Sequence, residues 1–179
     1  KPATVVWTEA QDGGDPKASV PHRDRLLALA APFTGDPAEL LRTQFRFDGI
    51  SWTEEGTAFV EEYDRATRWT RTWLLYSEGS EARRLWDHSA EDRYADPGAP
   101  VRRPGGGVAS AAILQHGNEI FLSGRGASPQ GDRPFLDRLD LATLRTERVF
   151  RTDDTSYESV VAPLAADGGT VLTRRESQT

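Results

Sequence analysis

The fold is decided by residues 49–86, which read GISWTEEGTAFVEEYDRATRWTRTWLLYSEGSEARRLW. Short runs rich in β-branched and aromatic residues alternate here with turn signals, a pattern that is typical of strands. We predict strands over 49–53, 57–63, 68–76 and 83–86, with tight turns at 54–56, 64–67 and 78–80. Four strands joined in this way within about forty residues form an antiparallel meander.

The same pattern extends to both sides of this stretch. Further strands are predicted over 4–9, 25–30, 39–42, 111–114, 119–123, 134–141, 146–150, 159–161 and 170–174. Four strands to each unit of about 40–50 residues is typical of β-propeller blades. We therefore predict an all-β chain that supplies roughly three blades of a larger propeller, as a single partial propeller domain over 1–179. The blades are predicted at 1–44 (partial), 45–89, 106–153 and 156–179 (partial). An open β-sandwich of about twelve strands is the alternative.

Composition excludes several classes of function. The chain has 179 residues and a net charge of −6, which argues against a nucleic-acid partner held by phosphate contacts. No apolar run approaches the roughly 18 residues of a membrane-spanning helix, so we predict no membrane segment. The absence of cysteine excludes disulfides, a thiolate nucleophile and cysteine-based zinc sites. The chain begins at Lys1 and contains no methionine, so we expect it to be part of a longer protein.

Catalytic motifs are missing from the sequence. The nucleophile motif Gly-x-Ser-x-Gly does not occur, and residues 124–128 have suitable residue types in the wrong order. The three histidines, His22, His88 and His116, adjoin predicted turns and have no metal-ligand spacing. We predict no catalytic residue, no metal site and no cofactor in this chain.

Three groups of acidic residues and the tryptophans each have two interpretations. Residues 12–15 and 153–154 are predicted to form turns rather than calcium loops. Glu61 and Glu62 are adjacent in a strand and therefore point to opposite faces, which favours a structural role over joint binding of an ammonium group. We expect the five tryptophans to pack between blade sheets, with sugar stacking as the alternative. These are Trp7, Trp52, Trp69, Trp73 and Trp86.

Several sequence runs together resemble a known family. They are residues 12–17, 21–24, 31–35, 45–47, 69–75, 131–139, 153–154, 156–158 and 173–177. In this order they resemble the propeller domain of the glutamyl endopeptidases, a subgroup of the prolyl oligopeptidase family of serine peptidases. The likeness spans nearly the whole chain.

The resemblance implies a two-domain peptidase. A C-terminal α/β-hydrolase domain, outside this chain, would carry the Ser, Asp and His of the triad and cut peptide bonds after acidic residues. The propeller would restrict entry to peptides or unfolded segments. A non-catalytic protein-interaction platform and a sugar-binding propeller are the alternatives. The resemblance favours an exported or periplasmic bacterial protein.

The long loops are predicted to share one rim of the propeller. Successive strands of a blade reverse direction, so the links between second and third strands lie on the same side as the links between blades. These segments are Asp12–Pro21, Asp64–Thr67, Arg93–Arg103, Gly124–Arg133 and Asp153–Tyr157. We expect this rim to face the hydrolase domain, and Arg125 and Arg133 to attract an acidic substrate. The alternative is that both arginines hold their loop through Asp132 or backbone carbonyls.

Overall fold

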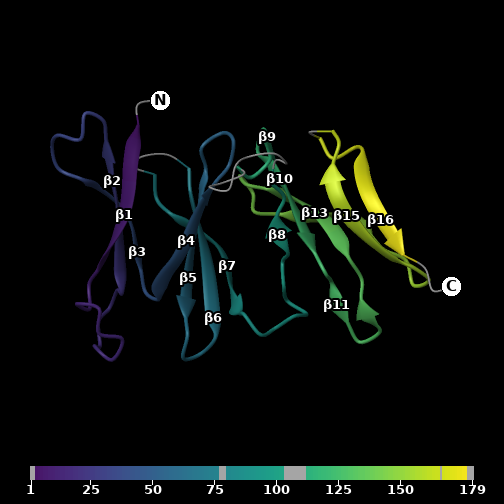
Figure 1. Ribbon diagram of the computed structural model, residues 1–179, viewed down its shortest axis with the longest axis horizontal. Helices are drawn as coiled ribbons and strands as arrows, with labels where there is room; N and C mark the ends of the chain where they lie inside the picture. The colour runs from purple at the N-terminus through teal and green to yellow at the C-terminus, as the bar shows by residue number, and fades with distance from the viewer. Residues whose placement is uncertain (1–2, 77–79, 103–111, 166, 177–179) are drawn as a thin grey trace. The chain divides into compact units, whose positions relative to one another are not determined.

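The computed structural model describes residues 3–76, 80–102, 112–165 and 167–176. All sixteen elements in these ranges are strands, and no helix occurs among them (Figure 1). The predicted all-β class is therefore confirmed. In the same ranges no helix is long and apolar enough to cross a membrane. Gly79, residues 103–111 and Ser177 belong to predicted features that lie outside the described residues.

The chain divides into two compact units, and unit 1 comprises residues 1–51 and 56–89. Its first sheet is antiparallel, in the order β1-β2-β3. The second sheet is a four-stranded meander in the order β4-β5-β6-β7, which confirms the prediction for residues 49–86. The strands are β1 (Thr4–Ala10), β2 (Asp24–Ala30), β3 (Ala38–Thr43), β4 (Arg46–Trp52), β5 (Ala58–Asp64), β6 (Trp69–Leu75) and β7 (Arg83–Ser89).

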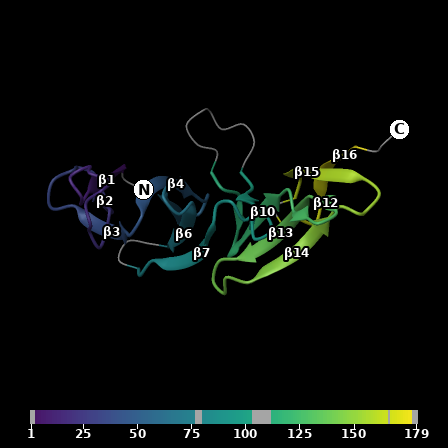
Figure 2. The ribbon, with the colours of Figure 1, turned by 90° about the horizontal axis from the view of Figure 1, so that it is seen from below.

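The core of unit 1 lies between its two sheets, which stand side by side in Figures 1 and 2. Alternate residues of β5 point to one face, so Ala58 and Val60 pack there with Leu26 of β2 and Leu75 of β6. All four side chains are buried. Partly buried hydrophobic residues surround them, namely Val6, Leu40, Leu41, Phe47, Ile50, Trp73 and Ala82. This apolar layer packs residues of both sheets of unit 1 against one another.

Unit 2 comprises residues 52–55 and 90–179. Its main sheet has the order β14-β13-β10-β8, with β9 also paired to β10, and two hairpins form separate sheets, β11-β12 and β15-β16. The strands are β8 (Ala99–Pro100), β9 (Gln115–His116), β10 (Glu119–Gly124), β11 (Ala127–Ser128), β12 (Gly131–Asp132), β13 (Phe135–Asp140), β14 (Thr146–Arg151), β15 (Tyr157–Pro163) and β16 (Val171–Glu176). Its buried hydrophobic residues include Ile113, Ile120, Phe121, Leu122, Phe135, Leu136, Leu139 and Leu141.

Each sheet joins strands that follow one another closely in the chain, as in a meander. The pairings are antiparallel between β1, β2 and β3, between β5, β6 and β7, between β8 or β9 and β10, between β10, β13 and β14, and within the hairpins β11-β12 and β15-β16. The described sheets are thus blade-type antiparallel sheets.

Two predictions of local structure were wrong. A strand was predicted over 111–114, yet within the described residues 112–114 only Ile113 makes isolated bridges, to Thr53 and Arg102. The edge of β10 is instead paired by β8 and β9, each two residues long. Directly after β8, the Val101 N–H donates to the Phe121 carbonyl at 2.8 Å and continues this pairing.

The segment 124–133 was predicted to be a long loop, and it contains the β11-β12 hairpin. Gly126, just before β11, and Gly131, which follows the turn, have φ of 62° and 110°, a region that glycine enters at little cost. The Arg133 N–H donates to the Gly126 carbonyl at 2.9 Å and closes the hairpin.

The tryptophans divide into packed and exposed residues. Trp73 packs on the core of unit 1, and the Trp86 ring is tilted against Phe59 with centroids 6.5 Å apart. Trp52 and Trp69 are 41% and 37% exposed, so the expectation of packing between sheets was wrong for them within this chain. Trp69 is the first residue of β6, and its indole N–H donates to Asp87.

Candidate functional site

The predicted rim loops lie together within each unit. In unit 1 the β1–β2 loop and the β5–β6 turn line the same hollow. In unit 2 the β7–β8 loop reaches the β11-β12 hairpin, because Arg93 forms an ion pair with Asp132 at 3.1 Å. Arg133, next to that hairpin, forms an ion pair with Asp154 of the β14–β15 loop. Each unit therefore presents a loop-lined candidate binding surface.

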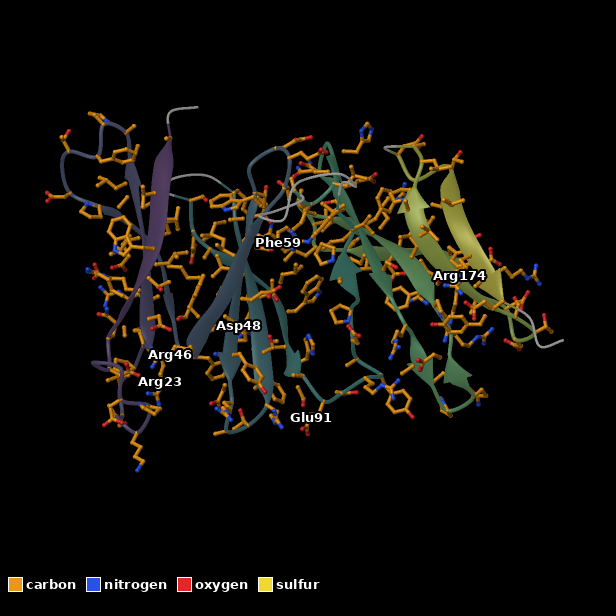
Figure 3. The ribbon with its side chains drawn as sticks, viewed as in Figure 1. Arg23, Arg46, Asp48, Phe59, Glu91 and Arg174 are labelled. Carbon is orange, nitrogen blue, oxygen red and sulfur yellow. The ribbon has the colours of Figure 1, made fainter. Side chains whose placement is uncertain are left out.

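The hollow of unit 1 has a volume of about 580 Å³. Figure 3 shows three of its residues, Arg23, Arg46 and Asp48, gathered at one end of the unit. Three arginines, two aspartates and four largely apolar residues line it: Pro16, Arg23, Phe45, Arg46, Asp48, Tyr63, Asp64, Arg65 and Ala66. We call this set of residues the arginine hollow.

Two buried aspartates hold the arginines of the hollow in place. The Asp12 side chain is fully buried and accepts hydrogen bonds from Arg23 at 2.9 Å, from Arg46 and from the Gly14 N–H. Asp24 accepts from Arg46 and, at 2.7 Å, from the Phe47 N–H. The β1–β2 loop is thereby tied to the start of β4.

The electrostatics of Asp12 follow from these contacts. The hydrogen bond from Arg23 is the largest cause that lowers the pKa of Asp12, to about 2, with smaller contributions from Gly14 and Arg46. Its carboxylate is therefore ionised at neutral pH, and the two guanidinium groups keep fixed positions at the mouth of the arginine hollow.

A second buried carboxylate fixes the apolar wall. Glu62 of β5 is fully buried and accepts from the Phe45 N–H at 2.6 Å and from the Trp73 indole N–H at 2.8 Å. The Arg71 guanidinium lies 4.1 Å from the centroid of the Phe45 ring. Glu62 thus has the structural role that the sequence predicted for the Glu61–Glu62 pair, and it places Phe45 in the hollow.

The remaining charged residues of the hollow are Asp64, Asp48 and Arg65, and their side chains differ in whether they have hydrogen-bond partners. Asp64 accepts from the N–H groups of Ala66 and Thr67 and from the Thr67 hydroxyl, and this hydroxyl is the main cause that lowers the pKa of Asp64. Asp48 and Arg65 are exposed, and neither side chain forms a hydrogen bond or ion pair among the described residues.

Unit 2 has a larger groove, of about 730 Å³, over the β14–β15 loop. Its lining residues are mostly acidic or polar: Gln130, Asp132, Arg133, Asp153, Asp154, Thr155, Ser156, Tyr157 and Glu176. Asp153 accepts from the N–H and hydroxyl groups of Thr155 and Ser156, and the Thr155 N–H is the main cause that lowers the pKa of Asp153 to about 2. The turn interpretation of residues 153–154 therefore fits these contacts.

The two arginines predicted to bind substrate have different surroundings. Arg133 lines this groove, but it forms an ion pair with Asp154 and donates to the Thr152 carbonyl at 3.3 Å. Arg125 is exposed and forms no hydrogen bond or ion pair with any residue that the structure describes. Arg133 thus contacts an aspartate and a backbone carbonyl, and its role and that of Arg125 in substrate binding stay predictions.

No group of three or more potential metal-binding side chains is found in the described part of the chain. His22, His88 and His116 come from different segments, the β1–β2 loop, β7 and β9. The Asp12–Asp15 segment forms a turn in which Asp12 accepts from Gly14 and Asp15 from Lys17.

Sequence reasoning did not identify the arginine hollow. Arg23, Arg46 and Arg65 were not singled out, because they come from three separate segments. Two sequence signals lay close to it: residues 21–24 and 45–47 both belong to the runs that carry the family resemblance.

Fold and site together define a chain of blade-type antiparallel sheets with loop-lined hollows at the strand ends. No family model matches the chain. It is 39% identical, over 196 aligned residues and all of its own length, to the probable chloroplastic glutamyl endopeptidase of Oryza sativa subsp. japonica. It is 38% identical over 198 residues, again along its whole length, to the probable chloroplastic glutamyl endopeptidase of Arabidopsis thaliana.

The chain spans about a fifth of the length of these relatives, 21% and 20% respectively. The crystal structure of TolB from Acinetobacter baumannii superposes with a TM-score of 0.43 and 14% identity, over 97% of this chain and 39% of that one. A superposition this loose carries no conclusion. The resemblance to glutamyl endopeptidases is confirmed along the entire chain.

Proposed function

We propose that the chain is the substrate-gating β-propeller segment of a serine peptidase of the prolyl oligopeptidase family that cuts peptides after acidic residues. The observation that carries this proposal is the match of the whole chain, at 38–39% identity, to two relatives named glutamyl endopeptidase. Because the chain spans only about a fifth of those relatives, most of the protein lies outside it. A C-terminal α/β-hydrolase domain with Ser, Asp and His would supply the catalysis.

The rim geometry supports a gating role. In each unit, loops from separate strand pairs lie together at one end of the sheets, and loops held on a scaffold of strands are where binding residues concentrate. In unit 2 the three loops are linked by the Arg93–Asp132 and Arg133–Asp154 ion pairs. Loops fixed in this way would form a stable opening of limited size, which admits extended peptides more readily than folded proteins.

Within this proposal, Arg125 and Arg133 contact the acidic side chain of the substrate. Arg125 is exposed and unengaged among the described residues, so its guanidinium is ready to meet a carboxylate. Arg133 would have to exchange Asp154 for the substrate, which lowers the net gain from such a contact.

The test uses the intact protein, expressed from its complete reading frame. A fluorophosphonate probe should label one serine, and that serine should lie in a Gly-x-Ser-x-Gly motif downstream of residue 179, followed by Asp and then His. If the protein contains no such motif and takes up no probe, the proposal fails and a protein-interaction platform becomes the better account.

A further inference from the structure

The arginine hollow of unit 1 has donor groups with no acceptor among the described residues. Arg23 uses one terminal nitrogen, Nη1, for Asp12 at 2.9 Å and for the Asp15 carbonyl at 3.4 Å. No described group accepts from its Nε or Nη2, although the side chain is 28% exposed. The exposed Arg65 adds a second guanidinium without a described partner.

The acceptors around the hollow are largely occupied. Asp12 and Asp24 are buried and receive bonds from Arg23, Arg46 and backbone N–H groups. Asp64 turns its oxygens toward its own turn. Asp48 is the exposed carboxylate that remains among the lining residues. A ligand that brings acceptors therefore fits the hollow better than one that brings donors.

The rest of the lining is suited to an apolar stem. Phe45, Tyr63 and Ala66 are in the lining, with Pro16 at the loop side. Phe45 is fixed by Glu62, and Arg23 by the buried Asp12, so neither must be ordered on binding. A short apolar chain that ends in a carboxylate combines these two requirements.

We propose that the arginine hollow binds an acidic side chain of a peptide, with its carboxylate on Arg23 and Arg65 and its methylene groups against Phe45 and Tyr63. This inference rests on the proposed function for the identity of the ligand as a peptide. It adds a second site for acidic side chains to the one proposed at Arg125 and Arg133.

The experiment measures peptide affinity by isothermal titration calorimetry on the intact protein after treatment with a fluorophosphonate. The first probe is an acetylated, C-terminally amidated octapeptide of Ala and Ser with one central Glu. The second has Gln in place of Glu, and the third has Gln and a free C-terminal carboxylate. Mass spectrometry after each titration verifies that the peptide stayed intact.

Arg65→Ala and Asp48→Asn are the informative variants, because both residues are exposed and their changes should have opposite signs. The Glu peptide should bind about fivefold more tightly than the Gln amide, and Arg65→Ala should remove most of this preference. Asp48→Asn should strengthen binding of the Glu peptide about twofold. Arg145→Ala, an exposed arginine of the β13–β14 turn, is the matched control and should change nothing.

Three results would overturn the inference. They are equal affinities for the Glu and Gln amides, an unchanged Glu preference in Arg65→Ala, and tighter binding of the free-acid Gln peptide than of the Glu amide. The last result would assign the hollow to a peptide terminus instead of a side chain. If the protein takes up no fluorophosphonate but Arg65-dependent binding of the Glu peptide persists, the inference stands and the proposed function fails.

Discussion

Glu62→Ala tests how much the buried carboxylate of Glu62 contributes to the stability of unit 1. Glu62 is fully buried in β5, and its carboxylate is the acceptor for the Phe45 N–H and the Trp73 indole N–H. Removal of the carboxylate leaves both donors without that acceptor in a site closed to water. It also frees Phe45, which forms part of the wall of the arginine hollow.

The size of the effect follows from these two donors. Each buried group that loses its partner costs about 1–3 kcal/mol, and the shortened side chain adds a small cavity. We expect Glu62→Ala to lower the free energy of unfolding of unit 1 by about 3–5 kcal/mol. Glu62→Gln keeps one acceptor oxygen, so its cost should be about half as large.

Hydrogen exchange of the intact protein, followed by mass spectrometry, measures this effect locally. Peptides that cover residues 45–52 and 58–75 should lose protection in Glu62→Ala. The matched control is Glu61→Ala, because Glu61 is the exposed neighbour on the opposite face of β5, and loss of an exposed carboxylate should lower the unfolding free energy by less than about 1 kcal/mol. Equal losses of protection in the two variants would refute the structural role of Glu62.

Three further predictions concern the rim and the second unit. The pKa of Asp12 is lowered from 3.8 to about 2 in the folded state, so its stabilising contribution is complete above pH 4 and is lost as the pH falls toward 2. The thermal midpoint of Asp12→Asn should therefore depend less steeply on pH between 4 and 2 than that of the wild type, and identical slopes would contradict this. Arg125→Ala should lower kcat/KM for a Glu-containing peptide more than for the matching Gln peptide, by a ratio that corresponds to about 1 kcal/mol of activation free energy. Arg133→Ala should show a smaller difference between the two peptides, because Arg133 is already paired with Asp154. Equal losses on both peptides would leave each arginine with a structural role only. Gly168→Ala should lower the free energy of unfolding by about 2–4 kcal/mol, because φ is 71° and the new Cβ would collide with the Phe121 ring. Gly117→Ala, with φ of 58° and open space around it, is the control and should cost about 1 kcal/mol; a cost as large as that of Gly168→Ala would show that the ring contact is unimportant.

The strands were predictable from sequence because their signals are local. Alternation and turn residues over 49–86 predicted the four-stranded sheet, and the structure differs from the predicted strand ends by a few residues only. The prediction failed at 111–114, where pairing depends on which distant edge is free. In the described residues, β10 pairs with the short β8 and β9 instead.

The candidate site was predictable only in outline. The reversal of successive strands predicted which loops share an end in each unit, since that rule needs topology alone. The ion pairs that shape the hollows join residues far apart in sequence, such as Arg46 with Asp12 and Arg93 with Asp132. Such pairs depend on tertiary packing, so sequence reasoning favoured Arg133 and missed Arg23 and Arg65.

The central claim is that this chain belongs to a serine peptidase that cuts after acidic residues. Its most direct test is digestion of a diverse peptide library by the intact protein, with the cut bonds identified by mass spectrometry. We predict cleavage on the carboxyl side of Glu and Asp that disappears when a fluorophosphonate blocks one serine. Absence of cleavage, or cleavage that shows no preference for acidic residues and survives the inhibitor, would contradict the claim.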